Sequence, residues 1–309
     1  MSAPNCPPDA MTPTPAGPDL SPLGLQARQV TGIGGGDTCR TWRAILADGS
    51  MAFVKQSPSH ADGMLELEAA GLTWLAAGGA GVPQVLGVGG GLLALTWVDA
   101  VRATPEAGRA FGEMLARVHL TAAPQFGSAP PTAPAGAVGW VGAVRVPFGS
   151  YDAWPQFYVH DRLLPTARAA SDVGGLTTSM HRTIDDLCDA LLSESIAVAG
   201  EPVAPAVVHG DLWSGNVMRQ PDGAVLIDPA AHGGHPESDL AMLHLFGTPQ
   251  LPGIVAGYES VRPLPARWRS RIALHQVFPL LVHAAMFGAG YGAQAADAAR
   301  TAVAAGRSD

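Results

Sequence analysis

The fold of this chain is decided by residues 207–234, which read VVHGDLWSGNVMRQPDGAVLIDPAAHGG. The Gln-Pro-Asp-Gly sequence at 220–223 predicts the turn of a β-hairpin. The apolar residues on either side predict its two strands, over 217–219 and 224–227. Asn216 and Asp228 each lie six residues from Asp222, which we take as the centre of the turn. A hairpin of regular register would therefore place them opposite each other at its open end.

The polar residues around this hairpin have the pattern of a phosphoryl-transfer site. Two oxygen ligands on rigid strands can hold Mg²⁺, which takes a few protein oxygens together with phosphates and water. His209, Asp211 and Asn216, followed by a strand that ends at Asp228, have the catalytic-loop spacing of kinase-like phosphotransferases. There the aspartate orients an acceptor hydroxyl and accepts its proton. The alternative is a plain hairpin whose Asp and Asn side chains cap turns.

The chain before this hairpin contains residues suited to hold ATP. Lys55 is the only lysine among the 18 Lys and Arg residues. It lies near the end of the third predicted strand, where an ATP-binding lysine is expected. Glu68 shares a predicted helix face with three leucines, and a carboxylate in an apolar stripe needs a partner. We therefore predict a Lys55–Glu68 pair, with Glu66 on the more polar face as the alternative.

Two short segments would complete the nucleotide site. A glycine turn between two predicted strands would cover the phosphates with its backbone amides, or serve as a plain turn: Gly34, Gly35 and Gly36. The run that ends the predicted sheet would offer backbone groups to adenine, and is equally a connection between lobes: Thr96, Trp97 and Val98.

The order of the predicted elements indicates an α+β protein with two lobes. Residues 1–22 are rich in proline and predict a flexible leader. Residues 23–98 predict a small antiparallel sheet with one helix, which forms an ATP-binding N-lobe. Residues 99–309 predict a mainly helical C-lobe that contains the hairpin. Helices are predicted at 105–120, 150–170, 177–199, 238–246, 254–258 and 265–287, with a long loop over 121–150.

Composition excludes several other classes of protein. The net charge of −8 argues against a general nucleic-acid binder, which needs a basic surface. The three cysteines show neither a disulfide framework nor CxxC metal spacing, which indicates a reducing, cytoplasmic environment. Residues 69–98 and 272–296 carry no charge. Their glycines, prolines and histidines nevertheless indicate buried elements rather than membrane spans.

Three other residues occupy suggestive positions. His232 and His235 have metal-like spacing, but the sequence offers no third ligand, so we interpret them as loop residues. Cys39 follows the glycine turn and is either a redox-sensitive thiol or a small buried apolar residue.

Several motifs together resemble one family, the fructosamine (ketosamine-3-) kinases, which are relatives of the aminoglycoside phosphotransferases. HGDLWSGN at 209–216 is the most specific of them, and LIDPA at 226–230 and GHPESDLAM at 234–242 also match. The resemblance runs from about residue 30 to 295. It implies a protein-kinase-like fold. Weaker matches are FVK at 53–55, ELEAAGLTWL at 66–75, LARVH at 115–119, FYVHDRL at 157–163 and FGAGY at 287–291.

The resemblance implies a role for each residue of the predicted site. Asp211 would be the catalytic base. Asn216 and Asp228 would be the Mg²⁺ ligands. Lys55 and Glu68 would serve the phosphates of ATP.

Further roles implied by the resemblance lie around this centre. Trp213 would flank the sugar acceptor. His209 and Asp239 would support the catalytic loop, Asp239 by accepting backbone N–H bonds, although an aspartate at a helix start is also favoured by the helix dipole. His283 would contact substrate, or be an ordinary core histidine. Pro236 replaces a usual arginine, and the segment around His283 lacks expected asparagines, so the identity of the sugar stays open.

The activity implied by the resemblance is ATP- and Mg²⁺-dependent phosphorylation of a ketoamine. The acceptor would be a fructosamine or ribulosamine, either free or on a glycated protein lysine. Phosphorylation of the third sugar carbon would destabilise the adduct and free the amine. One alternative is a kinase for an aminoglycoside or another small alcohol. An alternative of another class is a nucleotide-binding pseudokinase that acts as a scaffold.

Overall fold

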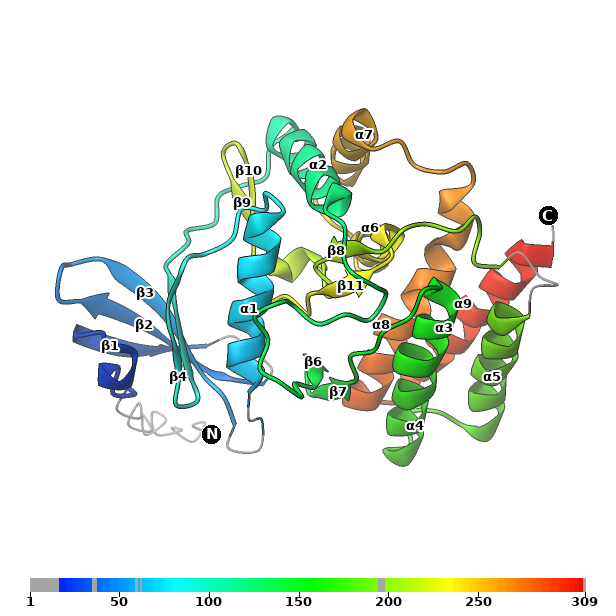
Figure 1. The fold of residues 1–309 in the computed structure, drawn as a ribbon, viewed down its shortest axis with the longest axis horizontal. Coiled ribbons are helices and arrows are strands. Elements are labelled where there is room, and N and C mark those ends of the chain that lie inside the picture. Colours follow the sequence, from blue (N-terminus) through cyan, green and yellow to red (C-terminus); the bar gives the residue numbers. More distant parts are fainter. Residues whose placement is uncertain (1–16, 35–37, 59–60, 62, 194–197, 308–309) are drawn as a thin grey trace, which may run out of the picture.

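A computed structural model describes residues 17–34, 38–58, 61, 63–193 and 198–307. It has the predicted α+β class, with a sheet at one end of the molecule and a helical part at the other (Figure 1). Five antiparallel strands form the sheet in the order β1-β2-β3-β5-β4. Their bounds are β1 (Ala27–Ile33), β2 (Arg40–Leu46), β3 (Met51–Gln56), β4 (Val85–Gly89) and β5 (Leu92–Thr96).

Because side chains alternate along β3, its residues on the two faces of the sheet have different neighbours. Ala52 and Val54 point to one face, where they pack in an apolar cluster with residues of β2 and β5. Phe53 and Lys55 point to the other face, which is covered by α1 (Met64–Ala77). Because successive residues of a strand face opposite sides, this register brings Lys55 onto the same side as Glu68 of α1.

The predicted flexible leader is wrong at its C-terminal end. Leu20 is only 3 % exposed and packs with Trp42 in the apolar cluster beneath the sheet. A short 3₁₀-helix, η1 (Ser21–Leu23), follows it. The sequence Asp-Leu-Ser-Pro places one large apolar residue among turn formers, and its burial stabilises this segment. Residues 1–16, the rest of the predicted leader, lie outside the described residues.

The helical part contains the helices predicted from residue 105 onward, with shifted bounds. Its described residues also form elements that the sequence does not predict: the final helix, α9, a small hairpin inside the predicted loop 121–150, and a pair of short strands that flank the central hairpin. The helices are α2 (Pro105–Leu120), α3 (Trp154–Phe157), α4 (Leu164–Asp172), α5 (Thr178–Leu192), α6 (Pro236–Leu245), α7 (Leu251–Val261), α8 (Ile272–Phe287) and α9 (Ala289–Arg307). The hairpin strands are β6 (Gly139–Val141) and β7 (Val144–Val146). A π-helical segment, η2 (Tyr158–Leu163), joins α3 to α4.

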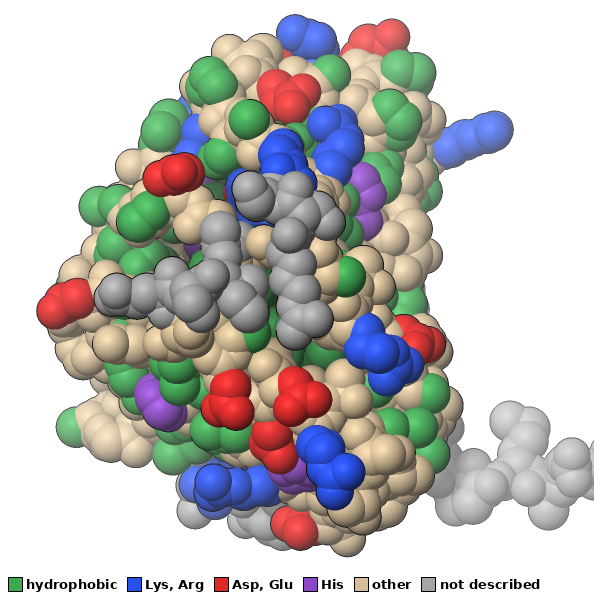
Figure 2. All heavy atoms as spheres, turned by 90° about the vertical axis from the view of Figure 1, so that its right-hand side faces the viewer, with side chains coloured by type: hydrophobic (Ala, Val, Ile, Leu, Met, Phe, Trp, Pro, Cys, Tyr) green, Lys and Arg blue, Asp and Glu red, His purple; other side chains and the backbone are tan. Residues whose placement is uncertain are grey.

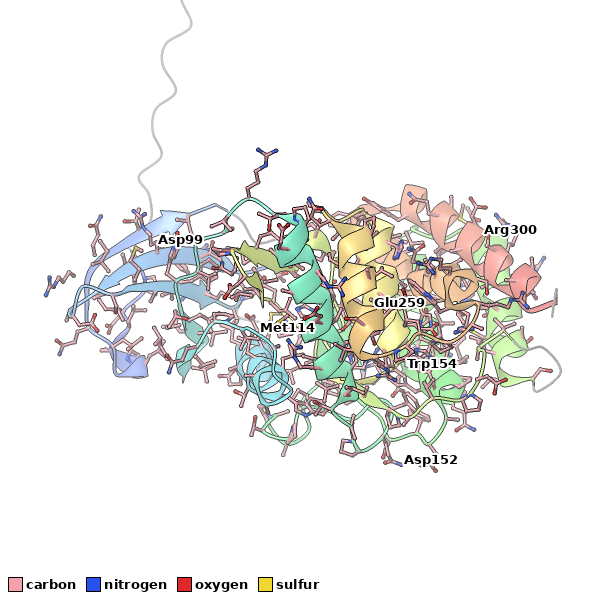
Figure 3. All side chains as sticks on the ribbon, turned by 90° about the horizontal axis from the view of Figure 1, so that it is seen from above. Asp99, Met114, Asp152, Trp154, Glu259 and Arg300 are labelled. Atoms are coloured by element: carbon pink, nitrogen blue, oxygen red, sulfur yellow. The ribbon has the colours of Figure 1, made fainter. Side chains whose placement is uncertain are left out.

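Helices α2 and α7 lie side by side, as seen in Figure 3, where Met114 marks α2 and Glu259 marks α7. The contact is close because a Cβ on Gly112 would collide with the carbonyl oxygen of Ile254. A glycine at this position therefore lets the two backbones approach. The pair forms one wall behind the central hairpin, where Phe111 and Leu115 of α2 pack in one apolar cluster with hairpin residues.

The central hairpin forms as predicted, but its register differs by one residue. Its strands are β9 (Val217–Gln220) and β10 (Gly223–Leu226), joined by a turn at Pro221 and Asp222. Gly223 pairs with Gln220, and Leu226 pairs with Val217. The amide of Ile227 accordingly donates to the carbonyl of Asn216 at 3.1 Å. Asn216 is therefore opposite Ile227, and the predicted Asn216–Asp228 cross-strand pair is wrong.

A second, shorter pair of strands supports the loop before the hairpin. β8 (Ala206–Val208) pairs antiparallel with β11 (His232–Gly234), so the segments on both sides of the hairpin are joined at their base. In the described part of the chain, every helix is too short or too polar to cross a lipid bilayer. Figure 2 shows the helical end of the molecule, where acidic and basic side chains are interspersed among apolar ones.

Candidate active site

A cavity of about 590 Å³ lies between the sheet with α1 and the central hairpin. Five polar residues that the sequence singles out for phosphoryl transfer line this cavity together: Lys55, Glu68, Asp211, Asn216 and Asp228. The β6–β7 hairpin contributes a further wall through Trp140. A volume of this size is typical of small-molecule sites.

Lys55 is the centre of a buried ion-paired group. Its Nζ donates to both carboxylate oxygens of Glu68, at 2.9 and 3.0 Å, and to Oδ1 of Asp228 at 2.6 Å. Burial alone would lower the pKa of Lys55, but the two carboxylates outweigh that effect and raise it. Burial raises the pKa of Glu68, and the Lys55 ammonium opposes that rise. The predicted contact with Glu68 is present, and Glu66 makes no ion pair among the described residues.

Asp211 lies on the loop between β8 and the hairpin, nearly enclosed by protein. Burial, together with the nearby Asp228 carboxylate, raises the pKa of Asp211 to about 7. Asn216 Nδ2 donates to the backbone carbonyl of Asp211 at 2.8 Å and to its Oδ2 at 3.1 Å. Within the described residues, Oδ1 has no hydrogen-bond donor. A carboxyl group with a pKa near neutrality and one unused oxygen is suited to accept a proton from a substrate.

The loop that carries Asp211 is anchored from behind by Asp239 at the start of α6. Its Oδ2 accepts from the backbone amide of His209 at 2.7 Å, and its Oδ1 accepts from the amide of Gly210 at 3.0 Å. These are the backbone bonds that the family resemblance implies for Asp239. Its Oδ2 also lies 3.1 Å from Nε2 of His119, whose Nδ1 is 2.9 Å from the hydroxyl of Tyr258. Helices α2, α6 and α7 therefore fix the loop together.

His209 and Gly210 shape the same loop locally. His209 Nδ1 accepts from the amide of Asp211 at 3.3 Å, and its Nε2 donates to the carbonyl of Ile227 at 2.9 Å. Burial lowers the pKa of His209, which favours the neutral ring that this bonding requires. Gly210 has a φ of +82°, and a Cβ there would collide with the carbonyl of Ala230. Only glycine fits this position without strain.

Two side-chain oxygens at the open end of the hairpin are suited to a hard divalent cation. Asn216 Oδ1 and Asp228 Oδ2 have no hydrogen-bond partner among the described residues, and both residues line the cavity. The φ of +54° at Asp228 breaks the strand alternation just after Ile227. Oxygen atoms of carboxylate and amide groups are what Mg²⁺ binds in proteins, so the residues present fit this ion.

Of the other residues predicted to bind the nucleotide, only some line the cavity. Gly34 lines the cavity, whereas Gly35 and Gly36 lie outside the described residues. The amide of Thr96 donates to Gln84, and that of Trp97 donates to Met51, so both serve the sheet. Contact of adenine with other backbone groups of Thr96, Trp97 and Val98 stays a prediction.

Of the two residues expected to contact the acceptor, one lines the cavity and the other does not. Trp213 lines the cavity and is 39 % exposed, so its indole is available to a ligand. His283 does not line it. Its ring packs instead against Phe246, Phe287 and Tyr291, and its Nδ1 lies 2.8 Å from the carbonyl of Pro279. The position of His283 therefore gives no support to a substrate role, which stays a prediction.

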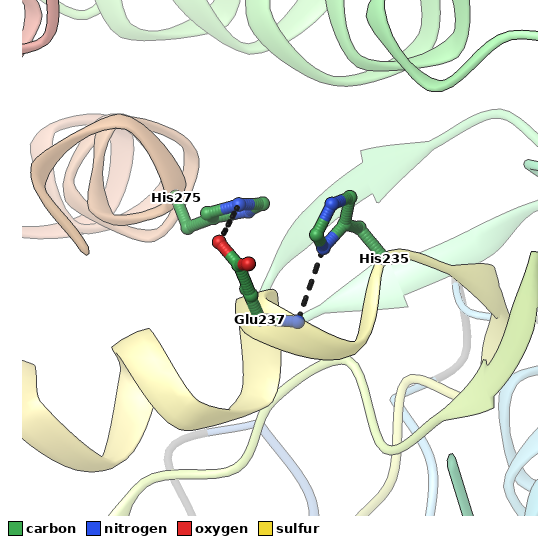
Figure 4. A group of neighbouring side chains, drawn as sticks. All are labelled: His235, Glu237 and His275. Atoms are coloured by element: carbon green, nitrogen blue, oxygen red, sulfur yellow. Dashed lines mark hydrogen bonds and ion pairs between the residues drawn. The ribbon is translucent and has the colours of Figure 1, made fainter. Parts of the chain in front are cut away.

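His235 has neighbours that the sequence does not reveal. Figure 4 shows it beside Glu237 and His275, all three buried. His235 Nδ1 accepts from the amide of Glu237 at 3.1 Å, and Nε2 of His275 lies 3.5 Å from Glu237 Oε2. Arg271 binds both oxygens of Glu237, at 2.9 and 2.6 Å. Because an arginine already neutralises the carboxylate, this group is an ion-paired brace of α6 rather than a metal centre.

Cys39 also lines the cavity and is half-buried. Burial raises the pKa of its thiol, which disfavours the reactive thiolate. Sequence reasoning misses several residues that line the cavity, among them Trp140 and Arg162. Trp140 lies in a stretch of Ala, Pro and Gly that predicts a loop. The sequence signal that could have indicated Arg162 as a cavity residue is its position close to aromatic residues in FYVHDRL.

Comparisons with known proteins agree with this geometry. The sequence model of the family described as fructosamine kinase matches residues 22–304. A "Probable ketoamine kinase" of Enterococcus faecium is 30 % identical over 280 residues, which cover 89 % of this chain and 95 % of the relative. The crystal structure of a "putative fructosamine-3-kinase" from Thermobifida fusca is 44 % identical, with a TM-score of 0.84, and covers 92 % of this chain and 97 % of that one. A macrolide 2'-phosphotransferase shares the fold, with a TM-score of 0.58 at 19 % identity over 90 % of this chain and 93 % of its own.

Proposed function

Because this chain belongs to the fructosamine kinase family, we propose that it transfers the γ-phosphoryl group of ATP to a sugar hydroxyl of a ketoamine. The acceptor class comprises fructosamines and ribulosamines, as small molecules or on lysines of glycated proteins. In its finer form the proposal is an ATP:ketosamine 3-phosphotransferase. Phosphate on the third sugar carbon then destabilises the adduct and releases the amine. The proposed location is the cytoplasm, where ATP is available.

The observation that carries this proposal is the state of Asp211. Its carboxyl group faces the cavity with one unused oxygen, its pKa is about 7, and its loop is fixed by Asp239. Phosphoryl transfer needs little covalent help from protein and depends on positioning and electrostatics. A fixed carboxylate that accepts the proton of an acceptor hydroxyl supplies the positioning. We assign this role of catalytic base to Asp211.

The nucleotide is proposed to lie on the sheet side of the same cavity. Lys55, held by Glu68, would contact its phosphates, and the turn at 34–36 would cover them. Asn216 Oδ1 and Asp228 Oδ2 would hold Mg²⁺. When bound, the ion offsets the charge of the triphosphate. The nucleotide-binding part is proposed to be residues 23–98 and the acceptor-binding part residues 99–309, with Val98 at their junction.

The proposal is tested by measuring ADP release in a coupled assay with Mg-ATP and a series of glycated amines of different sugar length. We expect turnover with ketoamines and a phosphorylated sugar in the product. Asp211→Asn should lower kcat about 10²- to 10⁴-fold while it leaves the affinity for ATP nearly unchanged. Asp222→Asn, in the exposed turn of the same hairpin, is the matched control and should retain full activity.

The same assay separates the two alternatives. Consumption of an aminoglycoside or a simple alcohol in preference to every ketoamine would identify another small-molecule kinase. Tight binding of ATP without turnover of any acceptor would identify a pseudokinase scaffold. Equal losses of ATP affinity and kcat in Asp211→Asn would contradict the role given to that residue.

A further inference from the structure

Arg162 is a buried cation on the wall of the catalytic cavity. It is 3 % exposed and lines both the main cavity and a smaller one, of about 40 Å³, behind Asp211. It belongs to the π-helical segment η2. Such segments are rare and occur frequently at functional sites, because the widened turn redirects a side chain.

The guanidinium of Arg162 is held rigidly. Its Nη1 donates to the carbonyl of Pro147 at 2.8 Å and to the carbonyl of Asp161 at 3.1 Å. Its carbon Cζ lies 4.6 Å from the ring centre of Phe157 and 5.7 Å from that of Phe278. The two aromatic rings and two carbonyls fix the plane of the group, so it is organised before any ligand arrives.

This cation has no ion-pair partner among the residues that the structure describes. Its Nε and Nη2 donate to no protein acceptor there. The neighbouring Asp161 makes no direct ion pair with it: its Oδ1 accepts from the hydroxyl of Tyr151 at 2.9 Å, and its buried Oδ2 has no hydrogen-bond partner among the described residues. Burial lowers the pKa of Arg162 to about 10, and the negative charge of Asp161 opposes that fall, so the guanidinium is still charged at neutral pH. A buried, unpaired guanidinium is costly unless something pairs with it.

The other charges of the cavity are already used. Lys55 is ion-paired with both Glu68 and Asp228, and Asp211 is the proposed base, so Arg162 is the cation of the cavity wall that has no direct ion pair among the described residues. A ketoamine nitrogen is protonated at neutral pH. A purely cationic acceptor would therefore be repelled by Arg162, whereas an acceptor that also bears an anion would be attracted.

We propose that Arg162 binds the carboxylate of the acceptor, which makes the preferred substrate the ketoamine of an α-amino acid. This inference rests on the proposed function. The planar fork of an arginine matches a carboxylate with two parallel hydrogen bonds. The carboxylate of an α-amino acid lies close to the ketoamine nitrogen. The sugar hydroxyl can therefore reach Asp211 while the other end of the molecule contacts Arg162.

The test compares two acceptors that differ only in this group, fructosylglycine and fructosylglycinamide. We expect the wild-type protein to prefer the acid by about 10- to 100-fold in kcat/KM, the range of a charge-assisted hydrogen-bond pair. In Arg162→Gln the preference should fall to near unity, through a higher KM for the acid, with an unchanged KM for ATP. Arg162→Lys keeps the charge without the fork and should retain part of the preference.

The ratio of the two acceptors within one variant does not depend on how much of that variant is folded. Arg168→Gln, on the exposed face of α4, is the matched control and should keep the wild-type ratio. Equal use of both acceptors by the wild type would overturn the proposal. A fall in kcat/KM in Arg162→Gln that is the same for both acceptors would also overturn it. That result would mean that the guanidinium contacts the transferred phosphoryl group or only stabilises the fold.

Calorimetric binding of the same two compounds keeps this inference separate from the proposed function. Tighter binding of the acid than the amide, lost in Arg162→Gln, would support the carboxylate site even if neither compound were phosphorylated. In that case the proposed kinase activity would be wrong and the binding site right. Phosphorylation of both compounds without any difference in affinity would mean the reverse: the kinase activity would be right and the carboxylate site wrong.

Discussion

Asp211→Asn is expected to stabilise the folded protein while it removes activity. Burial and the Asp228 carboxylate raise the pKa of Asp211 from 3.8 to about 7. A rise of this size in the pKa means that ionising the carboxyl group costs the folded state up to about 4 kcal/mol. An asparagine has the same shape and no charge, so it avoids this cost. Asn216 can still donate to its side-chain oxygen.

The sign of the effect depends on pH. Below about pH 4 the carboxyl group is protonated in both folded and unfolded chains and contributes no difference. Between about pH 4 and pH 7 the folded protein keeps a proton that the unfolded chain has released, so rising pH lowers the stability of the wild type. Above about pH 7 the full cost is present. The advantage of Asp211→Asn should therefore grow across this window and then become constant.

Thermal unfolding without nucleotide, measured from about pH 4.5 to 8.5, tests this expectation. The Tm of the variant should exceed that of the wild type by up to about 6 °C at the upper end. Asp222→Asn, in the exposed turn, should change Tm equally at every pH. The reasoning is refuted if Asp211→Asn differs from the wild type by the same amount at both ends of the range.

Three further outcomes are expected. Glu68→Gln should lose about 1.5–3 kcal/mol of stability, because Glu68, unlike Asp211, is paired with a buried cation, and the loss of its two charged hydrogen bonds to Lys55 outweighs the relief of its own burial cost. The control Glu66→Gln should lose little, and equal urea midpoints for the two variants would contradict the argument. The kcat/KM of the wild type should fall about tenfold per pH unit below about pH 7, because protonated Asp211 accepts no proton; a flat profile from pH 5 to 7 would exclude it as the base. Gly210→Ala should destabilise by more than about 1 kcal/mol, since φ is +82° and the new Cβ would collide with Ala230. Circular dichroism on heating checks this, and an unchanged Tm would count against it.

Much of this fold is predictable from local patterns. The alternation in β2 and β3 and the helical stripe of α1 predict the sheet and its covering helix, and together they place Lys55 beside Glu68. The last helix, α9, escapes prediction because its buried positions are alanines rather than large apolar residues: Ala295, Ala296, Ala299 and Ala302. It packs against α5 and α8, and this tertiary contact stabilises it. The burial of Leu20 escapes prediction for a similar reason, since its partners come from other strands.

The candidate site, like the fold, is predictable from the sequence only in part. Spacing within one loop predicts that Asp211, Asn216 and Asp228 meet at a single cavity, and they do. The predicted register of the hairpin is one residue off, because a two-residue turn and a longer one have nearly the same sequence signature. Residues that reach the cavity from distant elements, such as Arg162, leave no spacing signal. Their function depends on burial and on missing partners, which only the structure reveals.

The anchoring of the catalytic loop has a consequence for how such proteins diversify. Asp239, His119 and Tyr258 hold the loop from the interior and do not line the main cavity. The opposite wall comes from the β6–β7 hairpin and η2, which take no part in that anchoring. Evolution can therefore exchange the residues of this wall and alter which molecules are accepted, while the reacting aspartate keeps its place.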